Sequence, residues 1–283
     1  MIFNICIIKP KNFVHYLAFK EIAELLHYSL LKLKFKSHIS FNNFDTNPQI
    51  KNIIFGAHLL PDDLINSVPD NSIIFNTEQI GSLNLNKKWI NRIIKLAQRD
   101  IELWDYSHFN LQFIYNATKI KGKLFEIGYQ HELNRISPIK LPDVDVLFYG
   151  AINERRKYII DQLIDSKIKV KCLFGVYGED RDKWIANSKI VLNMHMYDSK
   201  IFEIIRVFYL MTNSVPVVAE YDKNTKIDNN YLDGLKASSY EDLIKNVIAL
   251  IGDKNDREEL GNRGSALIKK YPQEEFTKKI LNL

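Results

Sequence analysis

The sequence predicts an α/β protein that contains two parallel β-sheets, each covered by helices. Short apolar runs alternate with amphipathic helical stretches along most of the chain, which is the pattern of βαβ units. This alternation breaks once, at Leu133–Pro142, where two prolines and mixed charges indicate a linker. The chain has 283 residues and a hydrophobic fraction of 46%, which is enough apolar material for two separate cores.

The first half begins with a short apolar strand and a long amphipathic helix. The helix is predicted over Phe13–Leu33, because apolar side chains recur there at helical spacing. A second helix is predicted over Trp89–Leu96. The predicted strands are Ile2–Ile8, Ser37–Phe41, Asn52–Gly56, Ser72–Asn76, Ile101–Asp105 and Lys123–Ile127.

The second half repeats the alternation with clearer boundaries. The predicted strands are Asp145–Tyr149, Lys169–Phe174, Ile190–Asn193 and Pro216–Ala219. The predicted helices are Glu154–Leu163, Arg181–Ala186, Ile201–Thr212, Tyr240–Ile251, Asp256–Lys270 and Glu274–Leu283. We therefore expect two Rossmann-like domains, residues 1–135 and 136–283, that face a cleft, with a last helix, Glu274–Leu283, that can cross back to the first domain. Ligands of such sheets bind at the carboxyl ends of the strands.

Charge and cysteine content limit the partners and the compartment. The net charge of +5 fits nucleoside diphosphates, nucleic acid or a lipid surface, and no contiguous basic stripe favours nucleic acid. Cys6 and Cys172 lie in apolar runs and suggest buried thiols in a reducing cytoplasm. No run of about 20 apolar residues predicts a membrane span. The basic and apolar segment Leu31–Phe35 leaves peripheral contact with a membrane open.

The most informative segment is Asp145–Lys157, with the sequence DVLFYGAINERRK. A strand runs into Gly150, and a helix follows that carries Arg155 and Arg156 in its first turn. A glycine allows close approach to the backbone, and a helix N-terminus and arginines favour a phosphate. The alternative is a plain strand–loop–helix with solvated arginines. The absence of GxGxxG and Walker motifs argues against a simple NAD site or a P-loop.

A second segment, IFEIIRVFYLMTNSVPVVAE, places Glu203 and Arg206 three residues apart on one helical face. The carboxylate can accept hydrogen bonds from ribose hydroxyls, and the guanidinium can bind a diphosphate. The alternative is an ion pair on the helix surface, worth about 0.2–0.5 kcal/mol.

These segments resemble the nucleotide-sugar-binding half of GT-B glycosyltransferases of the bacterial family-1-like group. The resemblance includes the run between them, LFGVYGEDRDKWIANSKIVLNMHMYD. The resemblance covers Val144–Glu220. It implies a metal-independent GT-B enzyme that transfers a sugar from a nucleoside-diphosphate sugar. Tyr209 and Ser214 stand where the family has a glutamate and a turn glycine, and Ile201 replaces the first glutamate of its two-glutamate motif.

The resemblance implies a set of donor-binding residues. The diphosphate would contact Gly150, Asn153, Arg155 and Arg156, with Arg206 as a further cation. Glu203 would bind ribose or sugar hydroxyls, and His195 would contact the sugar or a phosphate. The base would lie at Gly175, Val176 and Tyr177. No metal site is expected, because no Asp-x-Asp motif follows a strand, and no cofactor is expected beyond the donor substrate.

Three residues after strands of the first half are candidates for the general base that removes a proton from the acceptor. They are Glu78, which we favour, His58 and Asp105; a retaining enzyme needs no such base. The implied acceptor is a glycan or glycolipid in bacterial surface polysaccharide synthesis, in the cytoplasm or at the inner face of the membrane. A nucleotide-sugar epimerase or hydrolase on this fold and a non-catalytic GT-B binding domain stay open. The sequence leaves the donor base, the sugar and the oligomeric state open.

Overall fold

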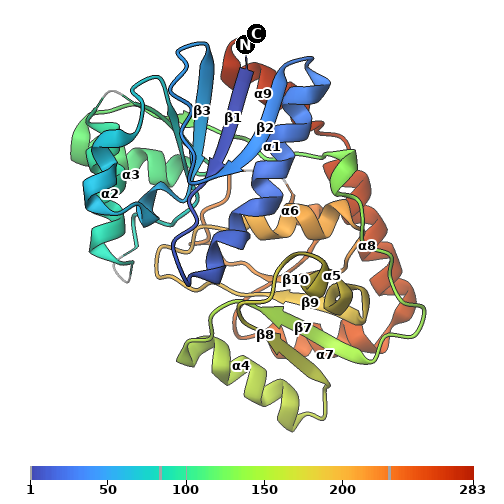
Figure 1. The fold of residues 1–283 in the computed structure, drawn as a ribbon. Helices are drawn as coiled ribbons and strands as arrows, with labels where there is room; N and C mark the ends of the chain where they lie inside the picture. The colour runs from blue at the N-terminus through green and yellow to red at the C-terminus, as the bar shows by residue number, and fades with distance from the viewer. Residues whose placement is uncertain (1, 83–84, 100, 229–230) are drawn as a thin grey trace. The chain divides into compact units, whose positions relative to one another are not determined.

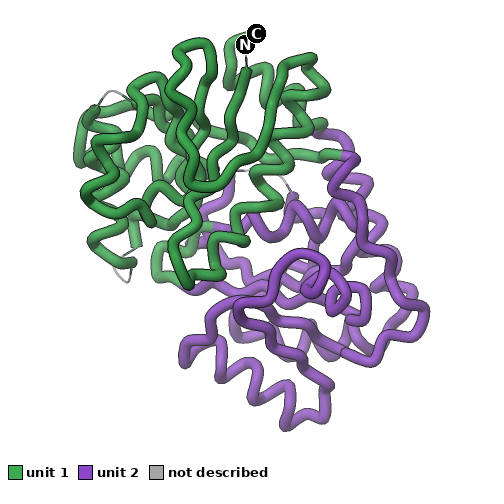
Figure 2. Tube along the Cα trace, in the orientation of Figure 1, with its two compact units in different colours: residues 1–130, 197–201, 272–283 green, residues 131–196, 202–271 purple. Residues whose placement is uncertain are grey.

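The computed structural model describes residues 2–82, 85–99, 101–228 and 231–283. The chain forms two compact units, shown in different colours in Figure 2. Unit 1 comprises residues 1–130, 197–201 and 272–283, and unit 2 comprises residues 131–196 and 202–271. Each unit contains one parallel β-sheet with helices packed against it, which confirms the predicted α/β class (Figure 1).

The sheet of unit 1 has the strand order β2-β1-β3-β4-β5-β6, with neighbouring strands parallel. The order reverses between β1 and β3, so this sheet has a switch point there. Its strands are β1 (Ile2–Ile7), β2 (Lys36–Phe41), β3 (Ile50–Phe55), β4 (Ile73–Asn76), β5 (Glu102–Asp105) and β6 (Lys123–Leu124).

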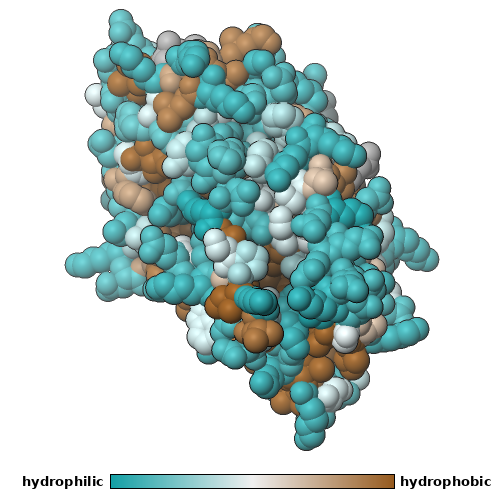
Figure 3. Space-filling model, turned by 90° about the vertical axis from the view of Figure 1, so that its right-hand side faces the viewer, coloured by the Kyte–Doolittle hydropathy of each residue, from teal (hydrophilic) through white to brown (hydrophobic). Residues whose placement is uncertain are grey.

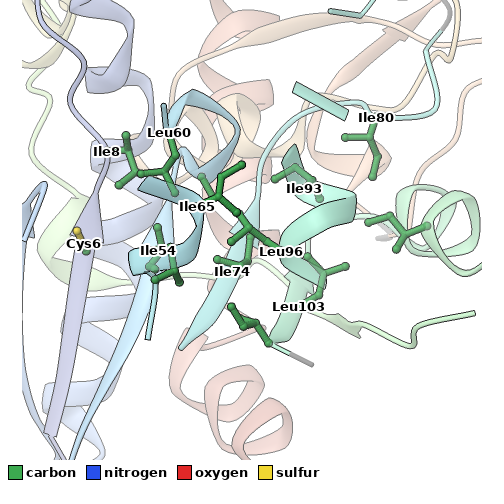
Figure 4. Packing of buried hydrophobic residues seen from close by; sticks show 14 of the residues in the cluster. Cys6, Ile8, Ile54, Leu60, Ile65, Ile74, Ile80, Ile93, Leu96 and Leu103 are labelled. Atoms are coloured by element: carbon green, nitrogen blue, oxygen red, sulfur yellow. The ribbon is translucent and has the colours of Figure 1, made fainter. Parts of the chain in front are cut away.

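Apolar side chains on alternate strand positions form the core of unit 1. Cys6, Ile54, Ile74 and Leu103 come from four strands and pack with apolar residues of the helices that follow β4 and β5 (Figure 4). The helices are α1 (Lys20–Lys32), α2 (Lys87–Ala97), α3 (His108–Thr118) and α9 (Gln273–Leu281), with 3₁₀ turns at Val14–Phe19, Ala57–Leu59 and Asp62–Ser67. Helix α9 packs against α1, where Ser29 Oγ and Thr277 Oγ1 lie 2.8 Å apart.

The sheet of unit 2 has the order β11-β10-β9-β7-β8, again with parallel neighbours. Its switch point lies between β7 and β9. The strands are β7 (Val144–Tyr149), β8 (Val170–Leu173), β9 (Ser188–Asn193), β10 (Val217–Glu220) and β11 (Lys236–Ser238). The helices are α4 (Glu154–Asp165), α5 (Gly178–Ala186), α6 (Ile204–Thr212), α7 (Leu243–Gly252) and α8 (Lys254–Ile268), with 3₁₀ turns at His131–Leu133 and Leu232–Gly234.

Both faces of the second sheet are covered. Val146, Phe148 and Leu192 point from β7 and β9 into a buried cluster with side chains of α4 and α7. Helices α5 and α6 contact β9 and β10, as expected of a doubly wound sheet. This arrangement leaves the carboxyl ends of the strands as the place where polar side chains gather.

Two elements escaped the sequence reasoning: helix α3 and strand β11. Helix α6 begins at Ile204, three residues later than predicted, so Glu203 is its N-cap residue. Within the described residues, no helix has the length and apolar character needed to cross a membrane. The face drawn in Figure 3 is mostly hydrophilic, with small separate apolar patches.

Candidate functional site

Arg206 lies against the carboxyl end of β7, at the switch point of unit 2. Its Nη1 donates to the backbone oxygen of Tyr149 at 2.6 Å, and its guanidinium lies 4.8 Å from the centre of the Tyr149 ring. A Cβ at Gly150 would lie only 3.1 Å from Arg206 Nη2, and Gly150 has a φ of 135°. Only glycine therefore fits here without moving the guanidinium. The Arg206 side chain is 22% exposed, which leaves it within reach of a ligand.

Glu203 joins Arg206 to a second guanidinium. Its Oε2 lies 3.2 Å from Arg206 Nη2, and its Oε1 accepts a hydrogen bond of 2.8 Å from Arg156 Nη2. Burial acts to raise the pKa of Glu203, but the charges of Arg206 and Arg156 outweigh it and lower the pKa below its ordinary value. Glu203 is therefore a carboxylate that fixes the position of Arg206.

The structure corrects the prediction that Arg156 faces a diphosphate. Its side chain is 2% exposed. Its guanidinium donates to the backbone oxygens of Ala151 at 2.9 Å and His195 at 3.3 Å, and also to that of Met194. Burial lowers the pKa of Arg156 in spite of the nearby Glu203. Arg156 therefore ties together the loops that follow β7 and β9 instead of facing a ligand.

Arg155 is also held within the protein. It forms a bidentate ion pair with Glu220, which includes a 2.7 Å hydrogen bond from Nη1 to Oε2. Its guanidinium lies 3.8 Å from the centre of the Tyr240 ring, and Tyr240 Oη donates to its backbone oxygen at 2.8 Å. Glu220 is 1% exposed. This clamp holds the first turn of α4 against the end of β10. The Arg155 side chain is 33% exposed, so its contact with a diphosphate stays a prediction.

Two other predicted donor residues have structural partners. Asn153 is the N-cap residue of α4, because its Oδ1 accepts from the backbone N–H of Arg156 at 2.9 Å. His195 is 3% exposed, and its Nε2 lies 3.1 Å from Thr225 Oγ1. Both residues shape the loops beside Arg206.

The predicted base-binding residues lie in the segment between β8 and α5. Gly175 has a φ of 72°, and Val176 and Tyr177 are half-buried. Sequence reasoning missed Phe174, which precedes them and is 64% exposed. The sequence offered little signal, because Phe174 continues an apolar strand-like run.

The three predicted base candidates come together at the carboxyl ends of β3, β4 and β5 in unit 1. His58 Nε2 lies 3.5 Å from Glu78 Oε1. Burial and the charge of Arg92 lower the pKa of His58 to about 3, so the imidazole is neutral at ordinary pH. The Glu78 side chain is 19% exposed, whereas that of His58 is only 3% exposed. Of this pair, Glu78 is the group that is more accessible to solvent.

Asp105 supports the loop that carries Glu78. The Asp105 side chain is fully buried and accepts hydrogen bonds from Asn76 Nδ2 at 2.6 Å, Asn110 Nδ2 at 3.0 Å and the backbone N–H of Ser107 at 2.9 Å. The same two amide groups donate to the backbone oxygen of Glu78 at 2.9 and 2.8 Å. The structure therefore corrects Asp105 from a base candidate to a residue that positions Glu78.

No group of three or more His, Cys, Asp or Glu residues that could hold a metal ion occurs among the described residues. In unit 2, the partly exposed guanidinium of Arg206 at the strand ends suits an anionic ligand.

No family model matches the sequence. Its relatives include uncharacterized viral proteins. The chain is 28% identical to uncharacterized protein L137 of Acanthamoeba polyphaga mimivirus over 200 residues, 68% of this chain and 26% of L137. It is 25% identical to uncharacterized protein L140 of the same virus over 234 residues, 80% of this chain and 73% of L140. The chain thus spans about a quarter of L137 and about three quarters of L140.

Solved structures share the fold along the whole chain. The β-glucosyltransferase of T4 phage in complex with UDP-glucose has a TM-score of 0.60 at 13% identity, covering 100% of this chain and 99% of that chain. HepE of Anabaena in complex with UDP-glucose has a TM-score of 0.60 at 10% identity, covering 100% and 98%. Sucrose-phosphate synthase from Thermosynechococcus elongatus has a TM-score of 0.56 at 8% identity, covering 99% and 98%. These neighbours are GT-B glycosyltransferases, and the chain has the GT-B fold.

Proposed function

We propose that this protein is a glycosyltransferase that moves a sugar from a nucleoside-diphosphate sugar to a hydroxyl group of a glycan or glycolipid. The observation that carries the proposal is Arg206, held at the switch point of unit 2 beside Gly150. A partly exposed guanidinium at that place can bind a pyrophosphate with charge-assisted hydrogen bonds. Two of the solved structures with this fold are complexes with UDP-glucose, so UDP is the first nucleotide to test.

The chemical role of unit 2 is to stabilise the leaving group. When the bond between the anomeric carbon and the diphosphate oxygen breaks, negative charge develops on the diphosphate. Arg206 uses Nη1 for Tyr149 and has Nη2 near Glu203, so further N–H groups of the guanidinium can donate to that charge. Glu203 keeps the guanidinium in place, so little reorganisation is needed when the bond breaks.

The chemical role of unit 1 is to activate the acceptor. Glu78 takes the proton of the acceptor hydroxyl while the oxygen forms its bond to the anomeric carbon. His58 lies 3.5 Å from the Glu78 carboxylate and helps to orient it. The network around Asp105 fixes the Glu78 backbone. This scheme gives inversion at the anomeric carbon.

Nucleotide binding tests the proposal directly. UDP, GDP and CDP are titrated into the parent protein, Arg206→Ala and Arg263→Ala, and the shift in melting temperature is measured. Arg263 is the matched control, because it is an arginine of unit 2 whose side chain is 48% exposed and pairs with Glu259 on the surface. At about 100 times its dissociation constant, a nucleotide should stabilise the parent by about 2.7 kcal/mol.

We expect the Arg206 variant to bind the preferred nucleotide about tenfold or more weakly, because it loses charge-assisted hydrogen bonds. The Arg263 variant should bind like the parent. Equal responses of both variants would refute the role of Arg206. A parent protein that binds no nucleotide diphosphate would instead favour a non-catalytic GT-B domain. Release of free sugar without any acceptor product would favour a hydrolase.

A further inference from the structure

Lys9, Tyr16 and Phe41 form an exposed cluster at the carboxyl edge of the unit 1 sheet. Lys9 Nζ lies 5.2 Å from the centre of the Tyr16 ring and 5.8 Å from the centre of the Phe41 ring. The two rings meet edge to face, with their centres 5.8 Å apart. Phe41 is 46% exposed, and Lys9 is exposed as well. An exposed contact of this kind adds little to the stability of a fold, so its position must decide whether it has a role.

The cluster lies at the switch point of unit 1. Phe41 is the last residue of β2 and the register partner of Ile7, the last residue of β1. Lys9 follows β1 by two residues, and the strand order reverses between β1 and β3. Strand ends at such a point are where ligands of parallel sheets bind. The cluster therefore has the place in unit 1 that Arg206 has in unit 2.

The loops that carry the cluster are fastened to each other by Asn42. The Asn42 side chain exchanges two hydrogen bonds of 2.7 Å with the Lys9 backbone, since its Oδ1 accepts from the N–H and its Nδ2 donates to the oxygen. The Asn42 N–H also donates to the backbone oxygen of Ile7 at 3.1 Å. The lysine and the Phe41 ring are thus held in place before a ligand arrives, which lowers the entropy cost of binding.

A short 3₁₀ turn, Val14–Phe19, connects the cluster to the candidate base. Tyr16 lies in this turn, and Phe19 at its end packs edge to face on His58, with ring centres 5.9 Å apart. His58 lies 3.5 Å from the Glu78 carboxylate. Glu78 follows β4, which is three strand spacings, about 14 Å, from β2. A ligand that places a hydroxyl at Glu78 and also reaches the cluster is therefore longer than a single sugar.

The chemistry of the cluster suits an acidic sugar. The faces of aromatic rings carry negative charge density and attract the C–H groups of a sugar ring. Lys9 forms no ion pair within the described part of the chain, so its ammonium can pair with an anion of a ligand. The cluster has one cation, whereas a nucleic-acid strand is bound through several.

We propose that Lys9, Tyr16 and Phe41 bind a sugar of the acceptor that is remote from the transfer site, and that this acceptor is an oligosaccharide with an acidic group. This inference rests on the proposed function and names the class of its acceptor.

Calorimetric titration with a matched pair of ligands tests the inference. Hexagalacturonate is a chain of acidic sugars, and its methyl ester is the same chain without charge. Both are titrated, with UDP and the single-stranded DNA hexathymidylate, into the parent protein, Lys9→Met, Phe41→Ala and Phe41→Trp. Lys119→Met and Tyr115→Ala are the matched controls, because Lys119 Nζ lies 5.7 Å from the centre of the Tyr115 ring. That contact is at the end of α3 just before β6 begins, at the opposite edge of the sheet.

We expect Lys9→Met to weaken hexagalacturonate binding about three- to tenfold and to leave binding of the methyl ester unchanged, because only a charge is lost. Phe41→Ala should weaken both sugar chains by a similar factor, and Phe41→Trp should keep both, since its ring offers the same kind of face. The two controls should bind every ligand as the parent does, and no variant should change the affinity for UDP. Since both mutated side chains of the cluster are exposed, the unliganded variants should keep the parental melting temperature.

Three results would overturn the inference. If Lys9→Met and Phe41→Ala bind hexagalacturonate as Lys119→Met does, the cluster does not bind the sugar chain. A parent protein that binds UDP but neither hexasaccharide has no such sugar site, while the proposed function stands. Tighter binding of hexathymidylate than of hexagalacturonate, lost in Lys9→Met and Phe41→Ala, makes the cluster a nucleic-acid site. If the sugar chain binds as expected but no nucleotide diphosphate does, the proposed function alone is contradicted.

Discussion

Replacing Glu203 with glutamine should destabilise unit 2 by more than the loss of a single surface ion pair would. The change removes the negative charge shared by Arg156 and Arg206 and leaves the guanidinium of Arg156 buried without a carboxylate. Breaking a buried ion pair costs about 3–5 kcal/mol. Two facts reduce this cost here: Arg156 keeps its three backbone acceptors, and the Glu203 side chain is 15% exposed. We therefore expect the free energy of unfolding to fall by about 2–3 kcal/mol.

Urea denaturation followed by circular dichroism measures this loss. Glu259→Gln is the control, because Glu259 pairs with Arg263 at 3.4 Å between exposed side chains, and its loss should cost less than about 1 kcal/mol. Hydrogen exchange should show where the damage lies, with faster exchange in the loops after β7 and β9. Equal stability of the Glu203 variant and the parent would refute the view that this carboxylate holds the two guanidiniums.

The same variant gives a prediction for pH. Because the pKa of Glu203 is lower in the folded protein than in the unfolded chain, its ionisation stabilises the fold above the unfolded value of about 4.3. This contribution is lost as the pH falls through the folded pKa. The stability difference between parent and Glu203→Gln should therefore be full at neutral pH and shrink below about pH 4. A difference that stays constant down to pH 3 would contradict the lowered pKa.

Two further predictions concern the loops at the strand ends. Glu78→Gln should abolish sugar transfer and change the free energy of unfolding by less than about 0.5 kcal/mol. Asp105→Asn should lower sugar transfer and also reduce the free energy of unfolding by about 2 kcal/mol, because it disturbs a buried hydrogen-bond network. Melting curves and sugar-transfer assays on both variants check this, and an Asp105 variant with parental stability contradicts it. Gly150→Ala should reduce the free energy of unfolding by about 1–3 kcal/mol, because residue 150 has a positive φ. It should also weaken UDP binding, because the added Cβ displaces Arg206. Unaltered UDP affinity in calorimetry would contradict the close contact.

The fold was predictable because apolar periodicity is a local property of the chain. The runs Ile2–Ile7 and Val144–Tyr149 read as strands from their own residues. Helix α3 was missed because HFNLQFIYNAT is rich in aromatic residues and asparagine, which are weak helix formers. Packing of Ile114 into the unit 1 core and an N-cap at Ser107 hold it as a helix. The packing of Ile114 is a tertiary contact and leaves little mark on the local sequence.

The candidate site was predictable only in part. A strand end pointed to Gly150 and a helical segment pointed to Glu203 and Arg206, and these residues do meet. The role of Arg156 was misread, because helical spacing alone does not reveal which side chain of a first turn points inward. That direction depends on Met194, His195 and Glu220, which lie roughly 40–65 residues further along the chain.

The internal guanidinium of Arg156 also matters to anyone who redesigns the loops that follow β7 and β9. It fastens main-chain atoms of two different loops, and main-chain atoms are present whatever the side chains are. The side chain at Ala151 can thus be varied while the anchor persists, whereas those of Met194 and His195 are buried and must be kept. A loop graft that changes the number of residues between Gly150 and Arg156 would instead pull the anchor out of register, and both loops would lose their shape at once.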